Sequence, residues 1–305
     1  MLAWLRLLRL PNHATAVADV LAGYLVVAGL RTLEWPPAAC WLAAVASLCF
    51  YAAGMVLNDV CDVELDRVER PERPLPSGAI GLRQAALAGS ALLAAGSVAA
   101  CATAVVARSP WPALVGAGLT AGVWLYDRHA KPTPSGPLVM GACRGLNWLL
   151  GMTAAGGVIG PLWTIPLGMA VYVAGLTLYA RDEAGRSRAA TLLGGLALMG
   201  LGLAIAARFI WPAVQAGENL PGSPLPASNW LLLWGILGTS ILLRGLLGVL
   251  DPSLGRVRAA VGNAIMSIIT LDAVLVLAFC GERWAIVVLM LLPLFLFGRR
   301  LVPPT

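Results

Sequence analysis

Ten apolar runs divide the chain almost from end to end, and each is about as long as a helix that crosses a lipid bilayer. Such a helix needs about 20 predominantly apolar residues. The runs cover residues 14–30, 38–57, 84–107, 111–126, 138–158, 161–180, 189–211, 229–250, 258–280 and 283–298. Charged residues make up only 12% of the 305 residues, against an ordinary share of about 25%. The pattern predicts an all-α fold, a polytopic transmembrane helical bundle of nine to ten spans, formed by one integral-membrane domain over residues 1–305.

The basic residues indicate how these runs are oriented. If the N-terminus is cytoplasmic and ten helices alternate, 15 of the 21 Lys and Arg residues fall on the cytoplasmic side and four on the other. Cytoplasmic loops carry such an excess of Lys and Arg, so we expect both termini in the cytoplasm. The net charge of +6 is then explained by these loops and does not indicate nucleic acid binding. The last two runs are joined by only two residues, which leaves nine or ten spans open.

A short acidic segment follows the second run, at its expected cytoplasmic end. Six of the 15 acidic residues fall between positions 59 and 72. On a continuing helix, Asn58, Asp62 and Asp66 would lie at i, i+4 and i+8, with Asp59 beside them. Because carboxylates stacked this closely repel one another, the segment indicates a bound cation. Such oxygen donors suit Mg²⁺ held together with a substrate phosphate, and a solvated acidic loop is the alternative.

The segment resembles the first aspartate-rich motif of the UbiA superfamily of intramembrane prenyltransferases. It reads Asn-Asp-x-x-Asp-x-x-x-Asp-Arg from Asn58 to Arg67, followed by Arg-Pro-Leu-Pro-Ser-Gly from Arg73. In that family the motif holds Mg²⁺ and, through it, the diphosphate of an isoprenoid donor. The resemblance implies that Asp62 and Asp66 are catalytic and that the two arginines bind diphosphate. The metal ligands that it implies are Asn58, Asp59, Asp62 and Asp66.

The family carries a second acidic motif after its sixth span, commonly Asp-x-x-x-Asp. Here the i+4 partner of Asp182 is Arg186, so the motif is degenerate, which puts a full two-magnesium site in doubt. An internal alignment of the second run with the sixth places Glu183 on Asp62. We therefore expect Asp182 and Glu183 as further metal ligands and Tyr179 as a substrate-binding residue. Ordinary loop acids are the alternative.

A third group of polar residues follows the fourth run. Lys131 is the only lysine in the chain, and its position is similar to that of a basic residue that contacts diphosphate in the family. Arg144 and Asn147 share one helix face below the membrane surface, where a cation is costly unless it faces a cavity or a partner. We interpret these three residues as substrate-binding, with an ion pair between helices as the alternative for Arg144. Tyr126 and Asp127 complete the predicted substrate-binding set, on the acceptor side.

The resemblance implies Mg²⁺-dependent transfer of an isoprenyl group from a prenyl diphosphate to an unidentified small-molecule acceptor, inside the lipid bilayer and at a cytoplasmic mouth. The metal and the basic side chains would stabilise the departing diphosphate. One alternative is a non-catalytic lipid or small-molecule carrier on the same bundle, which the degenerate second motif favours. The other is another membrane diphosphate-cleaving transferase, such as a CDP-alcohol phosphotransferase, whose Asp-Gly pair this sequence lacks.

Overall fold

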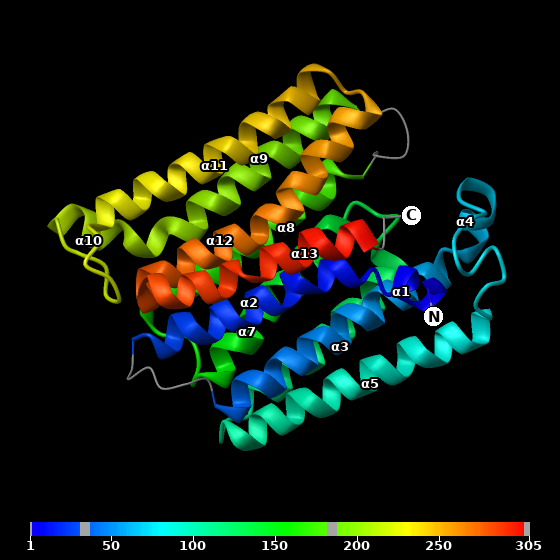
Figure 1. Cartoon of the computed structure of the whole chain (residues 1–305), viewed down its shortest axis with the longest axis horizontal. Coiled ribbons are helices and arrows are strands. Elements are labelled where there is room, and N and C mark those ends of the chain that lie inside the picture. The colour runs from blue at the N-terminus through cyan, green and yellow to red at the C-terminus, as the bar shows by residue number, and fades with distance from the viewer. Residues whose placement is uncertain (1, 31–36, 182–187, 302–305) are drawn as a thin grey trace.

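The protein is a bundle of long helices (Figure 1). The computed structural model describes residues 2–30, 37–181 and 188–301, and no β-strand occurs among them, so the predicted all-α fold is confirmed. The α-helices are α1 (Leu2–Leu7), α2 (His13–Ala28), α3 (Ala38–Cys61), α4 (Val63–Glu69), α5 (Leu82–Val106), α6 (Trp111–Leu125), α7 (Gly136–Ala154), α8 (Thr164–Tyr179), α9 (Ala189–Ala206), α10 (Trp211–Ala216), α11 (Ala227–Leu250), α12 (Leu254–Leu289) and α13 (Leu291–Leu301). Four short turns complete the fold, namely η1 (Leu10–Asn12), η2 (Tyr126–Ala130), η3 (Gly160–Trp163) and η4 (Ala207–Ile210).

Each of the ten apolar runs coincides with a helical segment. Among the described residues, six segments are long and apolar enough to cross a membrane. They are Ala38–Cys61, Leu82–Val106, Gly160–Tyr179, Ala189–Ala216, Ala227–Leu250 and Leu254–Gly298. The structure therefore supports an integral membrane protein, whereas the count of nine to ten spans and the side on which the termini lie stay predictions.

The joint between the last two runs lies inside α12, at Gly281. This residue has φ +73° and ψ −174°, a conformation that is essentially restricted to glycine. The chain turns back there, so that α13 lies beside α2 and η1 (Figure 1). The sequence predicts a two-residue connection between the last two runs, and the chain reverses within it at Gly281.

The helices of the N-terminal half and those of the C-terminal half meet along α2 and α7. Helix α2 packs against α3, α7 and α12, and α7 packs against α6 and α8 as well. Glycines allow α2 and α7 to approach closely: a Cβ on Gly23 would collide with the backbone oxygen of Trp148, and one on Gly151 with that of Val20. Small residues serve this purpose in helix packing within lipid.

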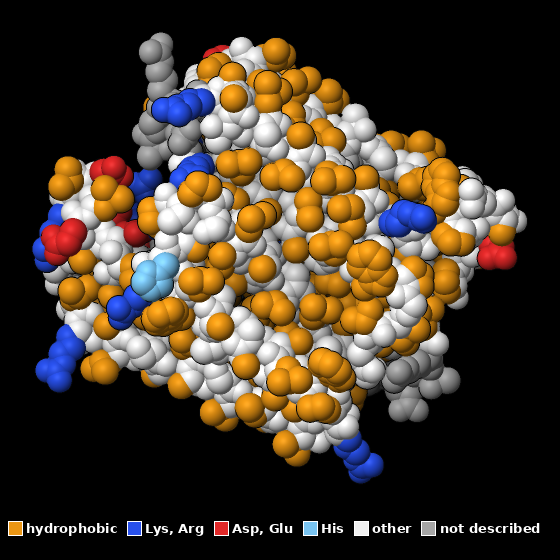
Figure 2. Space-filling model, turned by 180° about the vertical axis from the view of Figure 1, so that it is seen from behind, with side chains coloured by type: hydrophobic (Ala, Val, Ile, Leu, Met, Phe, Trp, Pro, Cys, Tyr) orange, Lys and Arg blue, Asp and Glu red, His pale blue; other side chains and the backbone are white. Residues whose placement is uncertain are grey.

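The surface of the bundle is largely apolar. In Figure 2, hydrophobic side chains cover the middle of the visible face, and charged side chains lie around its margin. On α11, for example, Leu232, Ile236 and Leu243 are all more than half exposed. Exposed apolar patches of this extent are rare on soluble monomers, and contact with lipid accounts for them.

Candidate active site

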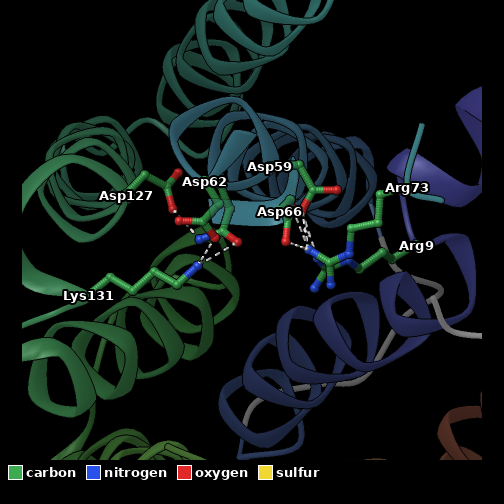
Figure 3. Close-up of polar contacts among 8 residues, drawn as sticks. Arg9, Asp59, Asp62, Asp66, Arg73, Asp127 and Lys131 are labelled. Atoms are coloured by element: carbon green, nitrogen blue, oxygen red, sulfur yellow. Dashed lines mark hydrogen bonds and ion pairs between the residues drawn. The ribbon is translucent and has the colours of Figure 1, made fainter. Parts of the chain in front are cut away.

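The acidic segment is bent at Asp62. Helix α3 ends at Cys61 and α4 begins at Val63, with Asp62 between them at φ −88° and ψ 0°. The helical spacing is nevertheless kept, because the Asp62 N–H donates to Asn58 O at 3.0 Å and the Asp66 N–H donates to Asp62 O at 2.8 Å. The expectation of one continuing helix is therefore corrected. As a result the acids form two neighbouring groups instead of one broad face (Figure 3).

The first of these, the Asp59–Asp66 group, joins two carboxylates to two arginines. The Arg73 guanidinium donates to both oxygens of Asp66, at 3.0 and 2.7 Å, and lies 3.7 Å from Asp59 Oδ1. Arg9 donates to the same oxygen of Asp59 at 2.7 Å. Asp59, Asp66 and Arg73 are all buried. Two negative and two positive charges thus balance one another within a space that is largely shielded from water.

The Pro-Leu-Pro-Ser-Gly turn holds Arg73 in this position. The Ser77 N–H donates to Arg73 O at 3.0 Å, and Gly78 reverses the chain with φ +75°. Leu75 and Ile80 are buried in a small apolar cluster beside α3. These contacts hold the backbone at both ends of the turn, so that the Arg73 side chain reaches Asp59 and Asp66.

The second, the Asp62–Lys131 group, connects α3 with η2. The Lys131 ammonium donates to Asp62 Oδ2 and, at 3.0 Å, to Asn58 Oδ1. Asn58 in turn donates to Asp127 Oδ1 at 3.2 Å, while Asp127 Oδ2 is buried without a hydrogen-bond partner among the described residues. Burial raises the pKa of Asp127 to about 7, and the hydrogen bond from Asn58 opposes that shift.

A π-helical turn brings Asp127 and Lys131 to this group. In η2 the Lys131 N–H donates to Tyr126 O, five residues back, at 3.1 Å. Such a turn inserts an extra residue into a helix and is frequent at functional sites. Tyr126 itself is half-buried at the start of the turn.

Arg9 is a member of the site that the sequence reasoning missed. It lies between α1 and η1 with φ +48°, in the left-handed region that non-glycine residues seldom adopt. Its place just before the first apolar run, on the same predicted face as the acidic segment, was the signal available. No local motif marks it.

Four predicted residues lie away from the two groups. Arg67 pairs with Glu64 at 2.7 Å on the exposed side of α4. Arg144 and Asn147 bind Asp19 on α2, at 2.7 and 2.9 Å, which matches the alternative of an ion pair between helices. Tyr179 donates to Gly245 O at 2.8 Å and joins α8 to α11. Asp182 and Glu183 lie outside the described residues.

The donor set of the Asp62–Lys131 group fits magnesium. Among the described residues, no three or more His, Cys, Asp and Glu side chains are gathered as a metal site. Mg²⁺, however, is usually bound through one or two carboxylates plus substrate phosphates, and Asp62, Asp127 and the Asn58 amide oxygen supply such donors. The Lys131 ammonium already places a positive charge between Asn58 and Asp62, so this position favours a cation.

The comparisons with known proteins identify the family of the chain. Residues 16–191 match the UbiA prenyltransferase family. Over 94 residues the chain is 40% identical to a digeranylgeranylglyceryl phosphate synthase of Methanoculleus marisnigri, a match that covers 31% of this chain and about a third (32%) of that relative.

Two solved structures share the fold. One, reported for digeranylgeranylglyceryl phosphate synthase in membranes, has a TM-score of 0.66 at 21% identity and covers 91% of this chain and 98% of its own. The other, a UbiA homolog from Archaeoglobus fulgidus bound to DMAPP and Mg²⁺, has a TM-score of 0.54 at 16% identity and covers 94% of this chain and 99% of its own. With the family match extending over more than half of its length, the chain belongs to the UbiA prenyltransferase family.

Proposed function

We propose that the protein transfers an isoprenyl group from a prenyl diphosphate to a small-molecule acceptor in the membrane, with Mg²⁺ as cofactor. The observation that carries the proposal is the Asp62–Lys131 group, which presents two carboxylates, an amide oxygen and a primary ammonium to one another. The family supports the reaction class, and the Archaeoglobus homolog, which binds DMAPP and Mg²⁺, supports the donor and the metal.

The acids and cations of the site would exchange partners when the donor binds. Asn58, Asp62 and Asp127 would hold Mg²⁺, which supplies positive charge to the diphosphate oxygens. Lys131 and Arg73, whose present partners are carboxylates, would then donate to diphosphate oxygens. Charge-assisted hydrogen bonds of this kind stabilise the negative charge that develops on the leaving group. Asp59 would keep Arg9 as its ion-pair partner.

The helices around the site would provide the apolar surroundings that an allylic cation needs. Water would otherwise capture the cation before the acceptor does, and a closed site excludes it. The names of the curated relatives contain glyceryl phosphate with two geranylgeranyl groups, which makes the hydroxyl of a prenylated glyceryl phosphate the first acceptor to test. Because each match covers about a third of those relatives, the acceptor and chain length are part of the proposal.

We place the mouth of this site in the cytoplasm. The excess of Lys and Arg in the loops on that side of the predicted topology supports this orientation. Helix α1 and the end of α13 lie at the same end of the bundle as α4 (Figure 1), in keeping with both termini on the side of the site.

A binding experiment tests the proposal. The purified full chain in lipid nanodiscs is titrated with radiolabelled geranylgeranyl diphosphate, with Mg²⁺ or with EDTA. We expect saturable binding that requires Mg²⁺ and is lost in Asp62→Asn, but not in the matched control Glu69→Gln, an exposed acid of the same segment. Binding that is the same with Mg²⁺ and with EDTA, and that is unchanged in Asp62→Asn, would refute the proposal. Binding that is never followed by transfer across a panel of acceptors would favour the carrier.

A further inference from the structure

A second polar cluster is buried in the bundle where α2, α7 and α12 meet. Its charged members are Asp19 on α2, Arg144 on α7 and Asp272 on α12. Both aspartates are 0% exposed, and Arg144 is 9% exposed. Asp272 lies outside the residues that match the family, which end at 191. The proposed transfer reaction uses none of these side chains.

Asp19 forms an ion pair with Arg144. Its Oδ2 lies 2.7 Å from Arg144 Nε and accepts a hydrogen bond from Asn147 Nδ2 at 2.9 Å. Arg144 also donates to the backbone oxygen of Thr15 at 3.1 Å. The other oxygen, Asp19 Oδ1, is buried and receives no hydrogen bond from the described residues.

Asp272, in contrast to Asp19, lacks hydrogen-bond partners among the described residues. It interacts with Asp19, Arg144 and Trp148, yet neither of its buried oxygens has a hydrogen-bond partner among the described residues. Tyr51 of α3 lies close to Asp19 and Arg144. The His13 ring at the start of α2 packs edge-on against Tyr51, with ring centroids 5.1 Å apart, and burial lowers the pKa of this histidine, which favours its neutral form. The described cluster therefore holds two carboxyl groups and one guanidinium.

Counting charges shows what the cluster lacks. With both acids ionised, one negative charge would stay uncompensated in the interior of the bundle, where an unpaired ion is very costly. Two carboxylates at one site also raise the cost of ionising the second. One additional positive charge removes both problems. Placed on Asp272 as a proton, this charge also supplies an O–H donor for Asp19 Oδ1, which otherwise receives no hydrogen bond from the described residues.

We infer that Asp272 is protonated and donates a hydrogen bond to Asp19 Oδ1, so that one proton joins α12 to α2 inside the membrane. A bound monovalent cation would balance the charge equally well. The proton is favoured because the Arg144 guanidinium lies 2.7 Å from Asp19 Oδ2 and Asn147 donates to the same oxygen, and this positive charge and this N–H donor would repel a metal ion. The proton thus ties the C-terminal helices to the helix that precedes the candidate active site.

Infrared spectroscopy tests this assignment directly. The full chain is labelled with carboxyl-¹³C aspartate and placed in nanodiscs in sodium-free buffer. The pH is set above the pKa of Asp127, which is about 7, so that Asp127 is ionised. We expect the C=O stretch of a protonated carboxyl at the ¹³C position, absent in Asp272→Asn and kept in Asp127→Asn. In Asp272→Glu the unlabelled acid should move the band to the ¹²C position, which keeps the test decisive if the Asn variant fails to fold.

A stability measurement separates the proton from a metal ion. Because Asn mimics a protonated carboxyl, Asp272→Asn should melt close to the wild type, whereas Asp19→Asn should melt clearly lower, since it leaves Arg144 buried without its anion. Replacing choline chloride by sodium chloride should not shift the melting temperature. A sodium-dependent rise that Asp272→Asn abolishes, or a wild type without the protonated-carboxyl band, would overturn the inference.

Discussion

The buried pair of Arg73 and Asp66 permits a prediction whose size follows from the structure. Both side chains are 6% exposed, and one guanidinium nitrogen donates to both carboxylate oxygens at 3.0 and 2.7 Å. Removing one partner of a buried pair leaves the other charge uncompensated, at a cost of about 3–5 kcal/mol. We therefore expect Arg73→Gln to lower the free energy of unfolding by that amount when EDTA is present.

Arg67 supplies the matched control for this prediction. It forms the same type of ion pair with Glu64, but both side chains are mostly exposed, and exposed pairs contribute about 0–1 kcal/mol. Arg67→Gln should therefore be nearly neutral. Both variants are unfolded chemically in mixed micelles of lipid and detergent, with helix content as the signal.

A double variant decides whether the lost charge balance is the cause. Adding Asp66→Asn to Arg73→Gln removes the stranded carboxylate, so up to about 3 kcal/mol should be recovered, because residues in direct contact couple by about 0.5–3 kcal/mol. A loss of stability in Arg73→Gln as small as that in Arg67→Gln would show that the buried charge is not uncompensated. A double variant no more stable than Arg73→Gln would show that the stranded Asp66 carboxylate is not the cause of the loss.

Three further outcomes are expected. Lys131→Met should weaken Mg²⁺-dependent binding of a prenyl diphosphate by at least ~10-fold, because a charge-assisted hydrogen bond contributes about 1.5–3 kcal/mol. The control Arg128→Gln, at an exposed position, should bind normally. Equal losses in the two variants would contradict the role of Lys131. Gly151→Ala should lower the free energy of unfolding by about 1–3 kcal/mol, because the added methyl group overpacks against Val20 O of α2. Gly235→Ala, whose methyl group would meet open space, should not lower it. Thermal melts of the two variants test the difference. Chelation of Mg²⁺ should abolish donor binding in an equilibrium assay, and restored metal should recover it; binding that persists in EDTA would exclude the metal.

The helices could be predicted from the sequence because hydrophobicity is a local property. Every apolar run of the chain coincides with a helical segment, and even the short connection before the last run appears, at Gly281. The bend at Asp62 could not be foreseen. The backbone hydrogen bonds continue across it, and only the packing of α4 away from the bundle decides where the acids point.

The site was predictable only where its members are neighbours in sequence. Asn58 and Asp62 form one motif, but their contact with Lys131 depends on how α3 packs against η2. Arg9 reaches Asp59 across 50 positions and belongs to no motif. The depth of Arg144 in the membrane indicated a partner or a cavity, and the partner proved to be Asp19, a choice that rests on the close approach of α2 and α7.

We propose that Asn58, Asp62, Asp127 and Lys131, at the ends of α3 and η2, support Mg²⁺-dependent cleavage of a prenyl diphosphate coupled to transfer of its prenyl group to an acceptor. The most direct measurement is the release of inorganic pyrophosphate from geranylgeranyl diphosphate by the full chain in nanodiscs, together with the prenylated product. We expect equal amounts of both, formed only with Mg²⁺ and acceptor present, lost in Asp62→Asn and kept in Glu69→Gln. Product formed by Asp62→Asn at the wild-type rate would show that this carboxylate plays no part in the transfer.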